Sequence, residues 1–133
     1  MSSAAELQKA IFAALGANTA LTALVGARIF DHAPVNVAFP YIVFGRTSVY
    51  DWSTGTESGT EQLFTVHAWS KAKGKKEVLG IMDLAGGTLH DATLALDGHS
   101  LVNLRLEFSE ARYDDRNEAH HGLLRFRAVV EPA

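Results

Sequence analysis

The sequence predicts an α+β fold, in which an antiparallel sheet of four to five strands carries two helices packed on one face. Two segments show the apolar periodicity of amphipathic helices, and the segments between and after them alternate between apolar and polar residues as strands do. A chain of 133 residues with 47% hydrophobic positions can form one core and is too short for two ordinary domains. We therefore predict a single domain over residues 1–133.

The first helix should begin at Ser3, because Ser3 and Glu6 have the spacing of a capping box. Apolar residues follow at helical spacing as far as Gly16, which can adopt the left-handed conformation that ends a helix. A second, short helical segment should stop at Gly26. Residues 28–31 are then expected to form a brief extended segment.

Two strands are expected at residues 41–49 and 61–69, which are rich in β-branched and aromatic residues. The polar arm between them, from Tyr50 to Thr60, is longer than the roughly 2 to 5 residues of usual hairpin loops. We therefore expect the arm to have a function. Its one large aromatic residue, Trp52, either anchors an interface or folds back to close one edge of its own domain.

A further helix is indicated by an apolar stripe from Val78 to Leu89, with a last turn that should fray or bend at Gly86-Gly87. Asp97-Gly98 is typical of a two-residue hairpin turn. Alternation in the strand after it places one set of apolar side chains on a common face: Val102, Leu104, Leu106 and Phe108. In the last strand, Arg125 and Arg127 lie on the face opposite Leu124, Phe126, Ala128 and Val130.

The two central strands carry apolar groups on both faces, which a single layer of helices cannot cover. Leu63 and Trp69 share one face with Thr65 and His67, while Phe64, Val66 and Ala68 lie on the other. Either loops bury the second face or another subunit does, and large exposed apolar areas usually mark contact surfaces. We expect a subunit interface made of Trp52, Leu63, Thr65, His67, Trp69, Arg125 and Arg127.

Composition and motifs give no indication of catalysis, a metal or a cofactor. The chain has no cysteine, and its net charge of −3 disfavours tight nucleic-acid binding. No apolar run approaches the roughly 20 residues that cross a membrane, and the N-terminus lacks the features of a signal peptide. His120 and His121 should project to opposite sides, which argues against a shared metal ion. His67 lacks an orienting carboxylate, so it is interpreted as a hydrogen-bonded sheet residue.

The basic run of Lys71, Lys73, Lys75 and Lys76 precedes or opens the third helical segment. We interpret it as a solvated face, with a contact to a phosphate or an acidic partner as the alternative.

Several segments, in this order, resemble those of the tail-completion, or tail-terminator, family of long-tailed phages and gene transfer agents. They are Phe39–Gly45, Asp51–Ser53, Phe64–Ser70, Leu101–Arg105 and His121–Ala128. The resemblance implies a homo-hexameric ring that caps the tail tube, stops its elongation and joins it to the neck protein. It also implies a location in the virion or phage-like particle, with assembly in the host cytoplasm and DNA only in transit through the ring.

A neutral or acidic channel wall would let DNA slide, whereas a basic wall would hold it. The candidates for a channel rim are therefore acidic: either Asp114, Asp115 and Glu118, or Asp51 and Glu57. Two other functions stay open. One is a neck or head-completion protein of the same particle, and the other is a small dimeric α+β ligand-binding domain or enzyme. The absence of convergent polar groups on the predicted apolar faces counts against the second.

Overall fold

The computed structural model describes residues 2–56 and 58–133 and contains three helices and six strands within these residues. Their bounds are α1 Ser3–Ala17, α2 Thr19–Val25, β1 Ile29–Phe30, β2 Tyr41–Asp51, β3 Thr60–Ser70, α3 Lys76–Leu89, β4 Ala95–Leu96, β5 His99–Asp114 and β6 Ala119–Pro132. The strands form one sheet in the order β1-β2-β3-β6-β5-β4. The α+β class is confirmed, whereas the predicted two helices and four to five strands are too few.

The sheet is not wholly antiparallel, because β1 pairs with β2 in parallel. The sequence predicts an extended segment at residues 28–31, and β1 lies within it. The pairing of β1 with β2 is not among the predictions. After α2 the chain passes along the edge of the sheet and returns through the two proline-containing turns before β2. The Ile42 amide then donates to the Arg28 carbonyl at 2.9 Å, so both segments run in the same direction.

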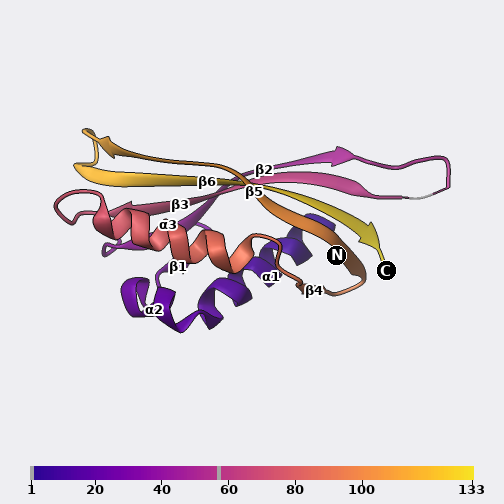
Figure 1. Cartoon of the computed structure of the whole chain (residues 1–133), viewed down its shortest axis with the longest axis horizontal. Coiled ribbons are helices and arrows are strands. Elements are labelled where there is room, and N and C mark those ends of the chain that lie inside the picture. The colour runs from indigo at the N-terminus through magenta and orange to yellow at the C-terminus, as the bar shows by residue number, and fades with distance from the viewer. Residues whose placement is uncertain (1, 57) are drawn as a thin grey trace.

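All three helices lie on one face of the sheet and leave the other face without a helical cover (Figure 1). The core lies between these layers, where Phe126 of β6 stacks on Phe64 of β3 with ring centroids 5.1 Å apart. The β2–β3 hairpin extends past the helices at one end of the molecule (Figure 1). The opposite end carries the turn between β5 and β6.

Helix α1 begins at Ser3 as predicted, but its capping residues differ from the predicted ones. Ser2, and not Ser3, caps α1, and its hydroxyl accepts from the Ala5 amide at 3.1 Å. Gly16 does not end α1, because Asn18 caps its last turn and also caps α2, accepting from the Leu21 amide at 3.0 Å. Helix α2 ends at Gly26 as predicted, and Gly26 has a positive φ of 61°.

Helix α3 runs through Gly86 and Gly87 to Leu89, so the predicted fraying of its last turn does not occur. Gly86 is buried against Leu106 of β5, and α3 packs on β3, β5 and β6 along its length. Tertiary packing therefore outweighs the intrinsic cost of glycine in a helix, about 1 kcal/mol per residue.

Two irregularities in β5 overturn the prediction that its four apolar residues share a face. The register against β6 shifts between Leu101 and Asn103 and again between Leu106 and Phe108. Each bulge inserts a residue and moves the following side chains to the other face. As a result Leu104 is buried, whereas Val102 and Phe108 are exposed.

The arm between the first two main strands is shorter than predicted. Asp51 pairs with Thr60, so both belong to strands, and the Trp52 amide donates to the Gly59 carbonyl at 2.9 Å. The connecting loop is therefore confined to residues 53–58. Trp52 lies against Gly59 of its own hairpin and remains 45% exposed.

Candidate interaction surface

The face of the sheet opposite the helices is referred to below as the open face. Alternation along β3 buries Phe64, Val66 and Ala68 under the helices and leaves the residues between them half-buried. Four predicted interface residues, Leu63, Thr65, His67 and Trp69, therefore share the open face. Arg125 and Arg127 pair with Thr65 and Leu63 in the register between β3 and β6 and lie beside them. The structure thus brings six of the seven predicted interface residues together, and Trp52 extends the surface along the projecting hairpin.

Three stacked rings cross from β3 to β6 on the open face. Trp69 stacks on His121 with centroids 4.2 Å apart, and His121 stacks on His67 at 4.9 Å. The Nδ1 atom of His67 lies 2.7 Å from Nε2 of His121, so one imidazole donates a proton and the other accepts it. The structure confirms the prediction that His67 is a hydrogen-bonded residue of the sheet.

Both imidazoles in this stack favour the neutral form. Burial lowers the pKa of His67. Burial is also the main cause that lowers the pKa of His121, and the nearby His67 and Arg112 lower it further. The carboxylates of Asp114 and Glu110 oppose this shift without reversing it.

The stability of the protein should therefore fall as the solution becomes acidic. Above 6.5, the ordinary histidine pKa, both rings are neutral whether the chain is folded or unfolded, and their contribution is fully present. Below that pH the unfolded chain takes up protons that the folded pair resists, so the free energy of unfolding decreases until the pH passes the lowered folded pKa values. Urea unfolding between about pH 7.5 and about pH 5.5 measures this slope.

The substitution His121→Phe keeps a ring on Trp69 and removes one titrating group, so it should flatten this dependence on pH. His32→Gln is the matched control, because His32 is exposed in the loop before β2. Equal slopes in wild type and His121→Phe would contradict the role assigned to the pair.

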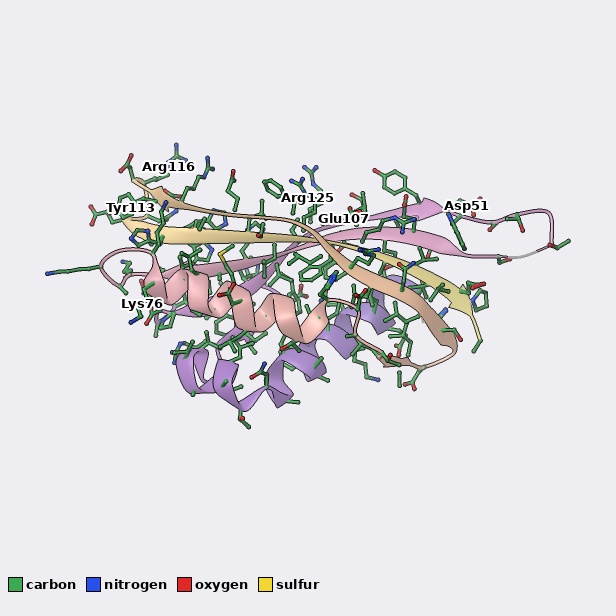
Figure 2. All side chains as sticks on the ribbon, in the orientation of Figure 1. Asp51, Lys76, Glu107, Tyr113, Arg116 and Arg125 are labelled. Carbon is green, nitrogen blue, oxygen red and sulfur yellow. The ribbon has the colours of Figure 1, made fainter. Side chains whose placement is uncertain are left out.

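Arginine is concentrated on the open face, and lysine is absent from it among the described residues. Five of the seven arginines lie there, at positions 46, 105, 112, 125 and 127. The lysines lie on α1, in the loop between β3 and α3, or at the first residue of α3. Arg127 forms an ion pair with Glu61 at 2.5 Å, and the Arg125 guanidinium lies 5.0 Å from the centroid of Phe108. Figure 2 shows Arg125 directed away from the helices.

The described candidates for a channel rim lie at opposite ends of the sheet. Figure 2 shows Asp51 at one end, whereas Arg116 marks the β5–β6 turn that carries Asp114, Asp115 and Glu118 at the other. A hydrogen bond from the Asn117 amide is the main cause that lowers the pKa of Asp114, and the Ser53 side chain does the same for Asp51. Glu57 lies outside the described residues.

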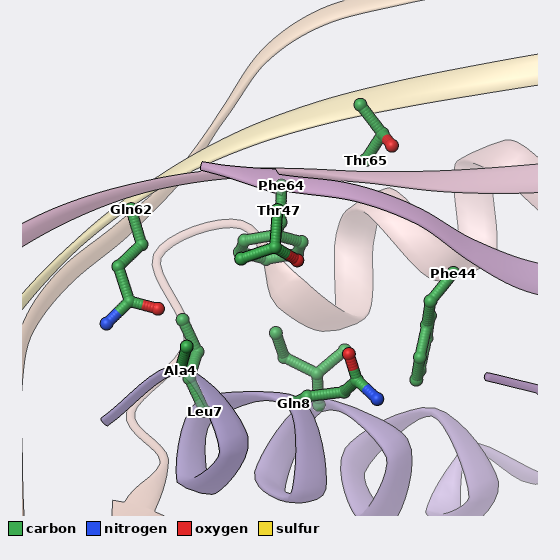
Figure 3. A pocket seen from close by; sticks show the side chains of 9 residues that line it. Ala4, Leu7, Gln8, Phe44, Thr47, Gln62, Phe64 and Thr65 are labelled. Carbon is green, nitrogen blue, oxygen red and sulfur yellow. The ribbon is translucent and has the colours of Figure 1, made fainter. Parts of the chain in front are cut away.

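The helical side of the sheet has a cavity lined by α1, β2 and β3 with room for about 10 Å³ (Figure 3). Phe64 and Thr47 point toward α1, whereas Thr65 points to the open face (Figure 3). A space of this size holds about one water molecule and no organic ligand.

The described residues contain no cluster of three or more histidine or acidic side chains that could hold a metal ion. His121 stacks on the open face, while the neighbouring His120 meets Tyr113 edge-on at 5.1 Å. Adjacent residues of a strand project to opposite faces of the sheet, so the imidazoles of His120 and His121 do not converge. None of the described helices is long and apolar enough to span a bilayer.

The lysine run lies at the end of the molecule where α3 begins, and its four members are exposed. Lys75 occupies the N-cap position without a side-chain hydrogen bond to the helix. Lys71 lies 4.8 Å from the ring centroid of Phe39.

Sequence reasoning missed the contribution of β2 and β5 to the open face. Arg46 and Tyr50 of β2 join it because a bulge between Phe44 and Thr47 shifts the alternation of that strand. The Gly45-Arg46 pair within an otherwise apolar strand was the one available signal, since glycine in a strand often marks a bulge.

Comparison with known proteins gives a match to a family and matches to solved structures. The family described as "Tail completion protein gp17" matches residues 9–131. A chain of the structure described as "Virion of native gene transfer agent (GTA) particle" is similar to this one with a TM-score of 0.90 and 29% sequence identity, and the match covers 98% of each chain. Among curated protein sequences there is no significant match.

Proposed function

This chain belongs to the tail completion protein gp17 family, and on that premise we propose that it caps a tail tube as a ring of identical copies. Family and structural similarity together make it a virion structural protein with a role in completing a phage or phage-like tail. The ring, which we expect to contain six copies, stops tube elongation and joins the tube to the neck. DNA passes through its opening, and the chain carries out no enzymatic reaction.

The observation that supports the ring most strongly is the open face. Its Leu63, Trp69 and Trp52 remain partly or largely accessible because the helices all lie on the other side. Arginine and aromatic residues dominate the face, and these residue types are enriched in protein interfaces, whereas lysine is depleted there. We propose that neighbouring copies cover this face.

The distribution of charge also bears on which surface meets the DNA in transit. An arginine-rich wall would retain the duplex by releasing its counterions, so the open face is a poor channel wall. The acidic residues at the ends of the sheet suit a channel rim better. Since these ends are far apart, one of the two sets, Asp51 with Glu57 or Asp114 with Asp115 and Glu118, is expected to line the opening.

Deletion of this gene tests the proposal most directly. Loss of a protein that stops tube growth should give tubes longer than those of the wild type, without attached heads. Electron microscopy of negatively stained lysates measures both properties. A copy of the gene supplied in trans should restore normal length and head attachment.

Tubes of normal length without heads would instead indicate a neck or head-completion protein. Normal, headed particles that lack this chain would overturn any role in completion. The enzyme or ligand-binding alternative predicts a dimer whose melting temperature rises with a small-molecule ligand, and a ring bound to tube ends would contradict it.

A further inference from the structure

Six of the eight residues that line a shallow depression on the open face carry hydrogen-bond donors, and the other two are Leu63 and Phe64. It lies between β2, β3 and β6, and its polar side chains are Arg46, Ser48, Tyr50, Thr65, His67 and Arg125. No carboxylate lines it among the described residues. Two guanidinium groups, three hydroxyl groups and an imidazole provide donors for an anionic group, and arginine in particular suits a carboxylate.

The two arginines of this depression have no carboxylate partner within the described part of the chain. The ion pairs there are Lys9–Asp97, His90–Asp91 and Arg127–Glu61. Arg127 is therefore neutralised, whereas Arg46 and Arg125 are exposed and carry uncompensated positive charge. This charge favours an acidic occupant.

An acidic segment of suitable form is present on the same chain. In the β5–β6 turn, the Asp114 carboxylate accepts from the Asn117 amide at 3.1 Å and from its side-chain Nδ2 at 3.2 Å. These bonds stabilise the turn, in which Asp115 and Glu118 are exposed. A pre-formed turn loses little conformational entropy on binding.

We infer that the depression receives the β5–β6 turn of a second copy, with Asp115 and Glu118 facing Arg46 and Arg125. This inference rests on the proposed ring and identifies its subunit contact. The turn cannot fill the depression of its own copy, because Arg125 lies six residues along β6 from Ala119, roughly 20 Å at the rise of a strand.

A contact between two different surfaces of one chain is heterologous, and such contacts close into rings when the rotation between copies permits it. The contact also decides between the two candidate rims. If the β5–β6 turn is buried against a neighbour, the end that carries Asp51 is left for the channel opening.

Charge reversal tests the contact in both directions. The full-length chain is mixed with purified tail tubes from a deletion strain, and binding to tube ends is measured by cosedimentation and electron microscopy. Arg46→Glu with Arg125→Glu should weaken assembly by about tenfold or more, and so should Asp115→Arg with Glu118→Arg. A chain that carries all four substitutions should recover most of the lost binding. Asp83→Arg, which reverses an exposed charge in the middle of α3 on the helical side, is the matched control and should bind like wild type.

A disulfide gives a second readout that does not depend on affinity. The chain has no cysteine, so Ser48→Cys combined with Asp115→Cys introduces a single possible pair. Oxidation of tube-bound protein should produce a ladder of covalent multimers. Each single variant, and Ser48→Cys combined with Asp83→Cys on the helical side, should produce no ladder.

The outcomes separate this inference from the proposed function. Suppose that the wild type caps tubes, but the fourfold variant does not recover binding and the cysteine pair gives no ladder. The inferred subunit contact would then be wrong, while the proposed ring would stand. Failure of the wild type to bind tube ends would overturn the proposed function and the inference with it. If Arg46→Glu with Arg125→Glu abolished retention of duplex DNA but left assembly unchanged, the depression would be a nucleic-acid site and the inference would be wrong.

Discussion

Gly122→Ala should lower the free energy of unfolding by about 1–3 kcal/mol, the usual cost of overpacking a core. A Cβ atom at Gly122 would lie 2.5 Å from Sδ and 2.9 Å from Cγ of Met82, and 3.1 Å from Cγ2 of Val78. Both residues belong to α3 and are buried, so either the Met82 side chain changes conformation or the helix shifts away from β6 to make room. Urea unfolding measures the change directly.

Gly80→Ala provides the matched control, because it adds the same methyl group with the opposite expected result. Gly80 lies in the middle of α3, and a Cβ atom there would have no neighbour within 4 Å. Alanine at this position should stabilise the protein by about 1 kcal/mol through its higher helix propensity. Destabilisation by both substitutions, or by neither, would contradict the close approach of α3 to β6.

Trp52→Ser should leave the fold intact and weaken assembly on tail tubes by roughly 30-fold or more. Trp52 is 45% exposed on the projecting hairpin, so its removal opens no cavity in the core. Buried tryptophans at interfaces commonly contribute 2 kcal/mol or more of binding free energy, which corresponds to this factor. Cosedimentation with tubes measures the loss, and thermal unfolding tests whether the fold is preserved.

The control for this variant is Phe12→Ser. Phe12 is 49% exposed on α1, on the helical side of the molecule. Both variants remove an exposed aromatic side chain, but only Trp52 lies on the proposed interface. If Trp52→Ser and Phe12→Ser bound tail tubes equally well, the β2–β3 hairpin would not be part of the proposed interface.

Much of the fold could be predicted because local patterns carry it. The faces of β3 and β6 follow from the alternation of apolar and polar residues within each strand. The structure confirms the predicted buried face of each of these two strands. Gly26 and the Asp97-Gly98 turn are equally local, since a left-handed conformation favours glycine whatever surrounds it. The open face was predictable for the same reason: Leu63 and Trp69 fall between residues that the helices must cover.

Other features depended on contacts between distant segments. The bulges in β2 and β5 reverse the faces of Arg46 and Phe108, and their positions are set by pairing with β3 and β6. The helical course of Gly86-Gly87 reflects packing on the sheet, which outweighs local propensity. The depression that holds Arg46 and Arg125 therefore could not be found in the sequence, because its residues come from three strands whose register had to be known.

By itself, the sequence determined the α+β class, the apolar and polar faces of the central strands, and the family resemblance, because each of these is written in the order and spacing of neighbouring residues. Only the tertiary structure decided the parallel pairing of β1, the separation of the two acidic ends and the gathering of arginines on the open face. These depend on strand register, and register is set by side chains that meet across the sheet and lie far apart in the chain.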